Sequence, residues 1–414
     1  MITASKQRIL AVDTLLSVFT NGKRLDETLK DIPNTETHLA QIYNITLGVT
    51  KHHNRLKAYL EKKLEKMPAP RVQFILEAAL FELSYNDSAK PYAVVSDALK
   101  MAENKYSGYK GLINAVLRRF SDNIGVEKKV LESAPLYPLW FMNELKNTFN
   151  SQAESIARGF IDPSPFFLFV NTRSTSVGEM VLKLKEQGVD CEIVSYRGVN
   201  AIKSFDKKVL HTQDFNKGLY TVQDISSQSA VNELKVLKGM SILDICSAPG
   251  GKAIAAAVMS DDAAEITAMD SSSLRLERVY ENIERMGVNS ISVVRDDFLS
   301  HSFNGKLFDR IILDPPCSAL GVVRRHPDIP WNRNEKLVES LCSQQLKMLS
   351  KALGLLTSGG RLLYSVCTFT QNETTVLINK ALKDVGGAVL VDSYYTLPNE
   401  IGMDGMFVAV LEKK

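Results

Sequence analysis

The sequence predicts an α/β protein in which a doubly wound, mostly parallel sheet follows an all-helical region and a small α+β module. Three patterns along its 414 residues indicate this division. Apolar residues recur at three- and four-residue spacing over residues 1–125, which is typical of amphipathic helices. Residues 138–235 mix helical and strand patterns. From Lys238 onward the two patterns alternate, as in doubly wound sheets. We therefore expect domains at 1–130, 131–235 and 236–414.

The composition and the cysteines exclude several classes of protein. With 45% apolar and 23% charged residues, the chain is neither collagen-like, nor a disulfide scaffold, nor wholly disordered. No apolar run reaches the ~18 residues of a membrane span, and Asp13 interrupts the first apolar stretch, so no signal peptide is expected. The five cysteines are scattered and form no Cys-x-x-Cys pair. This predicts free thiols, no metal site and a cytoplasmic location. Without an extended heptad pattern, a monomer is expected.

The charge is distributed unevenly along the chain. Residues 1–130 hold 20 Lys and Arg against 14 Asp and Glu, a net charge of +6, and the remainder carries −3. Such asymmetry indicates an anion-binding module at the N-terminal end. Residues 114–120, with Lys105 and Lys110, can present a basic face. On an isolated helix a solvated surface is the simpler interpretation.

The elements before residue 236 follow from local signals. In the helical region, Pro91 suits the first turn of a helix. Residues 139–149 predict a further helix, and Asp162-Pro163-Ser164-Pro165 marks a turn. A strand at 166–170, a helix at 177–184 and strands at 191–196 and 219–222 then predict a small module of the ferredoxin-like type.

The C-terminal half predicts five core strands separated by helices. The strands are expected at 241–245, 266–269, 291–295, 310–313 and 361–365. Helices are expected at 252–258, 273–286 and 337–355. Residues 388–392 and 406–411 add an antiparallel edge pair. Because ligands bind beyond the carboxyl ends of parallel strands, the residues at these ends are the candidate site.

The first three strand ends indicate a nucleoside-containing cofactor. The first strand runs into Cys246, Ser247, Ala248, Pro249, Gly250, Gly251 and Lys252. Paired glycines let the backbone approach a ligand closely, but the dinucleotide and P-loop spacings are absent. Asp270 ends the second strand, where a carboxylate binds ribose hydroxyls in NAD and S-adenosylmethionine sites alike. Asp296 and Asp297 end the third, where one carboxylate can accept from an adenine amino group. For any one Asp, helix capping is the simpler interpretation, so the argument rests on their agreement.

The last two strand ends carry thiols. The fourth is Asp314-Pro315-Pro316-Cys317, whose prolines stiffen the turn. The fifth ends at Cys367, and we expect the two strands to be neighbours. Thiolate addition to carbon 6 of cytosine makes carbon 5 nucleophilic, so that it can attack an electrophilic methyl group. Asp314 can act as the acid at N3, and a second thiol can assist release. Cys191 and Cys342 are expected to be small buried hydrophobes.

These residues resemble the Sun (Fmu) family of RNA cytosine-5 methyltransferases. The resemblance rests on residues 314–321, which run into Arg325-His326-Pro327-Asp328-Ile329, and on the turn 246–252. It implies a Rossmann-like methyltransferase sheet that uses S-adenosylmethionine. Cys367 is then the nucleophile and Cys317 the group that promotes product release. The cofactor is held by residues 246–252, Asp270, Asp297 and Asp314.

The N-terminal region resembles the NusB-like RNA-binding domain of the 16S rRNA branch of that family. The matching residues lie at 91–100 and 111–120, and residues 220–224 resemble the entry to the catalytic domain. The resemblance implies cytosine 967 of 16S rRNA as the target. The chain departs from the family's Thr-Cys-Ser pattern, because Val366 and Thr368 flank Cys367, which puts the rate in doubt more than the reaction. His326 is expected to be structural, beside Trp331.

Three alternatives stay open from the sequence. The same chemistry can act on tRNA or on another rRNA position. A non-catalytic RNA-binding ribosome-assembly factor needs neither the thiols nor the glycine turn. A nicotinamide-dependent dehydrogenase conflicts with the missing glycine fingerprint.

Overall fold

The computed structural model describes residues 4–33 and 39–414, and two compact units emerge from their internal contacts. The first unit contains residues up to Lys146 together with 151–161 and 325–333, and the second contains the rest. The expected three-part division at 130 and 235 stays a prediction. None of the helices in the described part of the chain is long and apolar enough to cross a membrane.

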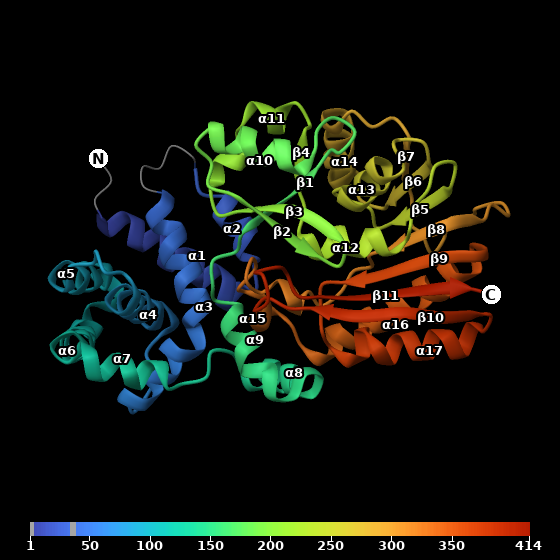
Figure 1. Ribbon diagram of the computed structural model, residues 1–414. Helices are drawn as coiled ribbons and strands as arrows, with labels where there is room; N and C mark the ends of the chain where they lie inside the picture. Colours follow the sequence, from blue (N-terminus) through green and yellow to red (C-terminus); the bar gives the residue numbers. More distant parts are fainter. Residues whose placement is uncertain (1–3, 34–38) are drawn as a thin grey trace. The chain divides into compact units, whose positions relative to one another are not determined.

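The first unit is helical, as predicted, around one apolar core (Figure 1). Pro91 is the first residue of its helix. Arg8 is buried in this core and is paired with Glu82, at 2.7 Å, and with Asp97. The helices are α1 (Ala4–Asn21), α2 (Leu25–Lys30), α3 (Leu39–Lys63), α4 (Pro70–Tyr85), α5 (Pro91–Met101), α6 (Lys110–Asp122), α7 (Ile124–Glu132), α8 (Leu139–Phe149), α9 (Ala153–Gly159) and α15 (Ile329–Asn332).

Residues 325–333, which follow the Asp-Pro-Pro-Cys turn in the sequence, pack within this helical unit. The Asp328 carboxylate accepts from the Leu25 amide at 3.3 Å, at the start of α2. The Trp331 ring lies edge-on to His53, with 4.8 Å between ring centroids. In the sequence, this segment and residues 314–321 form one family signature. In the structure, residues 325–333 belong to the helical unit, and residues 314–321 belong to the second unit.

The second unit begins with a four-stranded antiparallel sheet of order β2-β3-β1-β4. Its elements are β1 (Phe166–Val170), α10 (Val177–Glu186), β2 (Glu192–Tyr196), β3 (Val199–Ser204), α11 (Gln213–Asn216) and β4 (Tyr220–Val222). The sequence analysis missed β3. It is joined to β2 by a two-residue turn at Arg197 and Gly198, both with positive φ, and Tyr196 pairs with Val199. Such turns match the twist of paired strands, so an Arg-Gly pair was the available signal. Cys191 is buried in this module's core, as expected.

A second sheet of seven strands has the order β10-β11-β9-β8-β5-β6-β7. The strands are β5 (Ser241–Ile245), β6 (Glu265–Asp270), β7 (Ile291–Arg295), β8 (Phe308–Leu313), β9 (Leu356–Val366), β10 (Ala388–Thr396) and β11 (Met406–Lys413). The five core strands are parallel. The predicted antiparallel pair, β10 and β11, extends the β9 side. This confirms the doubly wound sheet and the adjacency of β8 and β9.

Helices cover both faces of this sheet (Figure 1). α12 (Ile225–Glu233), α13 (Gly251–Met259) and α14 (Ser273–Met286) pack on one face, where Ile242 of β5 points. α16 (Glu335–Gly354) and α17 (Thr375–Val385) pack on the other, where Leu243 points. Successive strand residues face opposite sides, so β5 is apolar on both faces and carries one carboxyl, Asp244.

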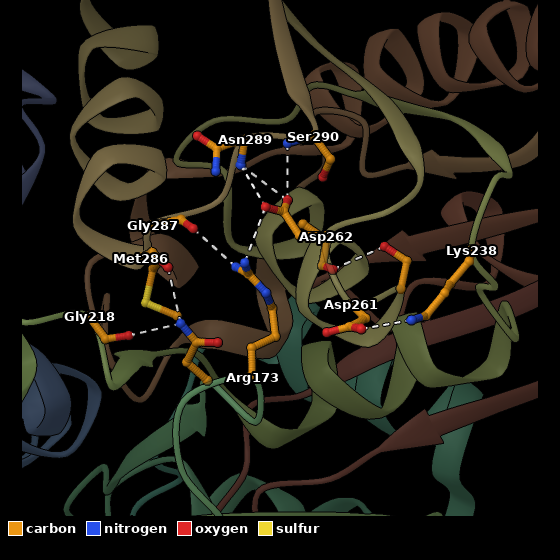
Figure 2. Close-up of polar contacts among 12 residues, drawn as sticks. Arg173, Gly218, Lys238, Asp261, Asp262, Met286, Gly287, Asn289 and Ser290 are labelled. Atoms are coloured by element: carbon orange, nitrogen blue, oxygen red, sulfur yellow. Dashed lines mark hydrogen bonds and ion pairs between the residues drawn. The ribbon is translucent and has the colours of Figure 1, made fainter.

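The four-stranded module is joined to the larger sheet by a polar cluster around Arg173 and Asp262 (Figure 2). The Arg173 guanidinium donates to the Gly287 carbonyl at 3.0 Å and pairs with Asp262 at 3.3 Å. Asp262 also accepts from the Asn289 and Ser290 amides. These contacts fix the turns at the ends of α13 and α14, opposite to the strand ends that carry the candidate residues.

Candidate active site

The candidate residues gather where the strand order reverses. β5 lies beside β8 in the sheet, although β6 and β7 come between them in the chain. The turns after β5, β8 and β9 therefore meet at one edge. Such switch points are the usual ligand sites of open α/β sheets. Residues 246–250, 314–318 and 367–370 occupy these turns.

Two thiols meet at this edge. Sγ of Cys317 and Sγ of Cys367 lie 3.3 Å apart, and both cysteines are free and half-buried. The hydrogen bond to Cys367, together with burial and the nearby Glu373 and Asp314 carboxylates, raises the pKa of Cys317 well above its ordinary value. Either thiol can donate in this contact, and the raised pKa of Cys317 favours Cys317 as the donor.

An ion pair links the turn after β5 to the turn after β8. Lys252, in the first turn of α13, donates to the Asp314 carboxylate. Burial disfavours the lysine's charge, but Asp314, Asp244 and Cys367 outweigh it and raise the pKa of Lys252 above its ordinary value. The sequence analysis assigned Lys252 to the cofactor. The structure places its ammonium on Asp314, because α13 follows β5 and β5 pairs with β8.

The glycine turn adopts a conformation that other residues rarely take. Gly250 has φ +95°, and a Cβ there would lie 3.2 Å from Cγ1 of Val279. Cys246 also has positive φ, at +60°. Burial and three carboxylates, Asp314, Asp270 and Asp244, raise the pKa of Cys246 to about 12. Three carboxyl groups therefore lie near this turn, and two of them, Asp314 and Asp270, are paired with Lys252 and Arg275.

The acids at the ends of β6 and β7 differ in their contacts. Asp270 is buried, and its carboxylate accepts from Ala248 N at 3.3 Å, from Ser272 N at 3.0 Å and from Arg275 at 2.8 Å. Asp270 thus joins the glycine turn. Asp297 is exposed and accepts from the Leu299 amide within its own turn at 3.0 Å. Its amide donates to the carboxylate of the candidate beside it, Asp296, at 2.8 Å, and Asp296 also contacts His301 at 2.7 Å.

Three residues that the sequence did not single out as site residues contact the candidate residues or the residues next to them. Glu373 is fully buried behind the two thiols and binds the residues that follow them, Ser318 and Thr368. Asp244 is buried in β5, where desolvation raises its pKa to about 7. Arg275 pairs with Asp270. A carboxyl within an apolar strand was a readable signal for Asp244, whereas nothing local distinguished Glu373 or Arg275.

The departures from the Thr-Cys-Ser pattern have separate explanations. Val366 is fully buried in the core between the sheet and α16. Thr368 keeps a hydroxyl, which lies 2.7 Å from the Ser318 hydroxyl. The residue after the candidate nucleophile therefore keeps a hydroxyl, and this hydroxyl makes hydrogen bonds in the structure. Cys342, on α16, is half-buried and lies apart from these turns in sequence and element.

The residues present suit a cationic cofactor with a ribose. The carboxylates around Cys246 favour positive charge and can bind ribose hydroxyls. They disfavour a pyrophosphate, which is anionic. This agrees with the missing dinucleotide fingerprint. Within residues 4–33 and 39–414, no group of three or more His, Cys, Asp and Glu side chains is arranged to hold a metal ion.

Three family models match the chain. Residues 231–412 match the model for 16S rRNA methyltransferase RsmB/F, and residues 5–122 match the NusB family. Residues 137–202 match the ferredoxin-like domain of RsmF/B-like methyltransferases. The helical, ferredoxin-like and Rossmann-like parts expected from the sequence are thereby confirmed.

Curated relatives align over nearly the whole chain. The ribosomal RNA small subunit methyltransferase B of Cronobacter sakazakii is 29% identical over 425 residues, which cover 98% of each chain. The protein of the same name from Escherichia coli O1:K1 is 29% identical over 431 residues, again 98% of each.

Solved structures share the fold. The protein PH0851 superposes with TM-score 0.78 at 20% identity and covers 100% of both chains. NSun6 from Pyrococcus horikoshii, solved with SFG, superposes with TM-score 0.61 at 20% identity and covers 67% of this chain and 98% of its own.

Proposed function

The chain carries the RsmB/F-type 16S rRNA methyltransferase domain together with a NusB domain and the ferredoxin-like domain of those enzymes, and from this premise we propose its reaction. It transfers a methyl group from S-adenosylmethionine to carbon 5 of a cytosine in 16S rRNA, at position 967. The 3.3 Å contact between Cys317 and Cys367, at the ends of neighbouring strands, is the observation that supports this most directly.

The first step is addition of the Cys367 thiolate to carbon 6 of the cytosine. The new S–C bond moves the electron pair of the 5,6 double bond toward N3, which takes up a proton. Asp314 lies on the neighbouring turn and can relay that proton to N3 from the Lys252 ammonium, which is hydrogen-bonded to its carboxylate. Carbon 5 thereby becomes an enamine carbon, which is nucleophilic.

S-adenosylmethionine, when bound, supplies the electrophilic methyl group. The residues that would hold it are the turn 246–251 and Asp270, with Asp297 at the next strand end. Their carboxylates favour the sulfonium and can accept from the ribose hydroxyls. Asp314 is linked to this turn by its ion pair with Lys252, the residue that follows the turn. The turns that carry the thiols and the turn that would hold the cofactor therefore lie at the same edge of the sheet.

Release regenerates the thiolate. The proton on carbon 5 leaves to a base, the 5,6 double bond re-forms, and the electron pair of the S–C bond returns to Cys367. N3 gives its proton back to the pair of Asp314 and Lys252. A thiol that donates a hydrogen bond to the departing sulfur lowers the cost of this step. Cys317 is such a donor, because its raised pKa keeps it protonated.

The RNA must present an unpaired or flipped-out cytosine, because a stacked base cannot reach the thiols. Residues 1–130 carry the net positive charge, and phosphate contacts there would strengthen docking and weaken with salt. Part of this charge is already neutralised. Arg119 pairs with Glu127, at 3.3 Å, and Lys110 with Glu103, at 3.6 Å.

The two cysteines give opposite outcomes in one experiment. Cys367→Ala should abolish methyl transfer to 16S rRNA and leave S-adenosylmethionine binding intact by calorimetry. Cys317→Ala should instead accumulate a protein–RNA adduct on a denaturing gel. Undiminished transfer by the Cys367 variant would exclude it as the nucleophile. Normal turnover without adduct would remove the release role from Cys317.

The target is tested separately by mapping 5-methylcytosine in rRNA and tRNA from a deletion strain. Loss at position 967 of 16S rRNA supports the proposal. Loss at another position or in a tRNA keeps the chemistry but changes the substrate. No loss anywhere, combined with absent cofactor binding, would favour a non-catalytic RNA-binding role.

A further inference from the structure

Behind the two thiols lies a buried carboxylate that the proposed reaction does not use. Glu373 ends the short 3-10 helix 371–373 and is fully buried. Its Oε1 accepts from the Ser318 amide at 2.8 Å and from Nε2 of Gln345 at 3.0 Å. Its Oε2 accepts from the hydroxyls of Ser318, Thr370 at 2.8 Å, and Thr368 at 3.3 Å.

These contacts join the residues that directly follow the thiols. Ser318 follows Cys317, and Thr368 follows Cys367. Their hydroxyls lie 2.7 Å apart and both bind the same carboxylate oxygen. Residues 50 positions apart in the sequence are thus held through one side chain.

Gln345 of α16 extends the hold to the other side of Cys317. Its Nε2 donates to the Pro316 carbonyl at 2.8 Å as well as to Glu373. The hydroxyl of Tyr364, on β9, donates to Gln345 Oε1 at 3.3 Å and to the Glu373 carbonyl at 2.9 Å. The turn 316–318 is therefore fixed on both sides of its thiol.

The hydrogen bonds that the described residues make to this carboxylate all come from uncharged donors: one backbone amide, one side-chain amide and three hydroxyls. A buried carboxylate is costly unless its lone pairs are satisfied, and hydrogen bonds to a charged group are stronger than neutral ones. The arrangement thus gives the turns a rigid, directional anchor. Its negative field also contributes to keeping Cys317 protonated.

We propose that Glu373 is a positioning residue that holds Cys317 and Cys367 at contact distance by binding the residue after each of them. Its consequence for catalysis rests on the proposed function, but its effect on the thiol separation does not. Glu373 touches neither substrate nor cofactor in this scheme. It acts through the two turns.

The test measures the thiol separation without RNA or cofactor. A short bifunctional alkylating reagent, dibromobimane, becomes fluorescent when it bridges two nearby thiols. Glu373→Ala should slow this cross-linking about tenfold, and it should lower kcat by about 10²-fold with little change in KM for rRNA, because a misplacement of about 1 Å is that costly. Cross-linking at the wild-type rate would overturn the proposal.

The conservative variant separates geometry from charge. In Glu373→Gln the amide oxygen can face Ser318 N–H and Gln345, while two of the three hydroxyls turn to accept from the amide nitrogen. Cross-linking should therefore return close to the wild-type rate. The pH at which Cys317 is alkylated should fall, because the negative charge is gone. Cross-linking as slow as in Glu373→Ala would contradict the hydrogen-bonded anchor.

A second variant pair keeps the test decisive if Glu373→Ala fails to unfold cooperatively. Ser318→Ala combined with Thr368→Val removes the hydroxyl links and keeps the carboxylate. Thr370→Val removes one hydrogen bond to the same carboxylate but touches neither residue after a cysteine. Slower cross-linking in the double variant than in Thr370→Val supports the proposal, and equal rates overturn it. If the wild type methylates no rRNA, the proposed function is wrong. The cross-linking rates still test whether Glu373 holds the two thiols together, because they need neither RNA nor cofactor.

Discussion

The two sides of the candidate site use carboxylates in opposite ways. On the cofactor side, formed by the turns after β5 and β6, Asp244 and Asp270 converge with Asp314 on Cys246. On the thiol side, formed by the turns after β8 and β9, Glu373 is saturated with neutral donors. On the first side, two of these carboxylates are paired with the basic residues Arg275 and Lys252, whereas on the second side neutral donors bind the carboxylate and fix the geometry of the turns. Lys252 joins the two sides through Asp314.

Removing the Lys252–Asp314 ion pair should have the largest effect on the free energy of unfolding. Lys252→Met leaves Asp314 without its cation in a partly buried site, and breaking such a pair from one end costs about 4 kcal/mol. Lys252→Met combined with Asp314→Asn should recover part of this loss. Urea unfolding measures both variants, and equal losses would mean that the two sides are not coupled through this pair.

The pH dependence of stability should reveal the cofactor-side charge. The folded state holds the pKa of Asp244 at about 7, above its ordinary 3.8, so the folded protein binds a proton that the unfolded chain releases. Stability should therefore fall as pH rises from about 4 to 7, by at most ~4 kcal/mol. Thermal unfolding of Asp244→Asn over this range should be flatter than that of the wild type.

Asp262, at the far end of α13, provides the matched control with the opposite sign. Burial opposes its charge, but the Ser290 and Asn289 hydrogen bonds and Arg173 outweigh it and lower the pKa below the ordinary value. Its contribution is present above that value and is lost as pH falls. Asp262→Asn should therefore lose stability at neutral pH. A gain there would contradict the sign assigned to the cluster in Figure 2.

The thiol side should be intolerant of added volume. Gly321 donates to the Cys367 carbonyl at 2.9 Å, and a Cβ at this position would lie 1.9 Å from the Gly405 carbonyl oxygen. Gly321→Ala should cost ~2 kcal/mol, as overpacking does, and should slow thiol cross-linking. Gly354→Ala, where a Cβ meets nothing within 4 Å, is the control. If the two variants unfold alike, the close approach is not structurally important.

The smallest expected effect is a loss of cofactor affinity that leaves the thiol side unchanged. Asp270→Asn removes the charge from the end of β6 and should weaken S-adenosylmethionine binding about tenfold, as expected for charge-assisted hydrogen bonds. Calorimetry measures this loss. Thiol cross-linking should stay at the wild-type rate, since the donors to the Asp270 carboxylate among the described residues are Ala248, Ser272 and Arg275, and none of them lies on the turns after β8 and β9. A change in cross-linking would show that the sides are not independent.

Much of the secondary structure could be predicted from the local sequence pattern. Strands and helices follow from periodicity, so β5 to β8 and α14 lie within two residues of their expected bounds, whereas β9 begins at Leu356, five residues before the expected strand. The acids and thiols at the strand ends were readable for the same reason, since a strand's end is a local property. Pro91 at the start of α5 is another local signal that was confirmed.

Contacts between distant residues were decided only by the tertiary structure. The adjacency of β5 and β8 brings Lys252 to Asp314, and the adjacency of β8 and β9 brings the thiols to 3.3 Å. Glu373 finds its five donors on the turns and on α16 only once the sheet has formed. Sequence determines what each segment tends to be and which groups end it. Hydrogen-bond partners depend on which segments become neighbours, and that is set by burial of the whole chain.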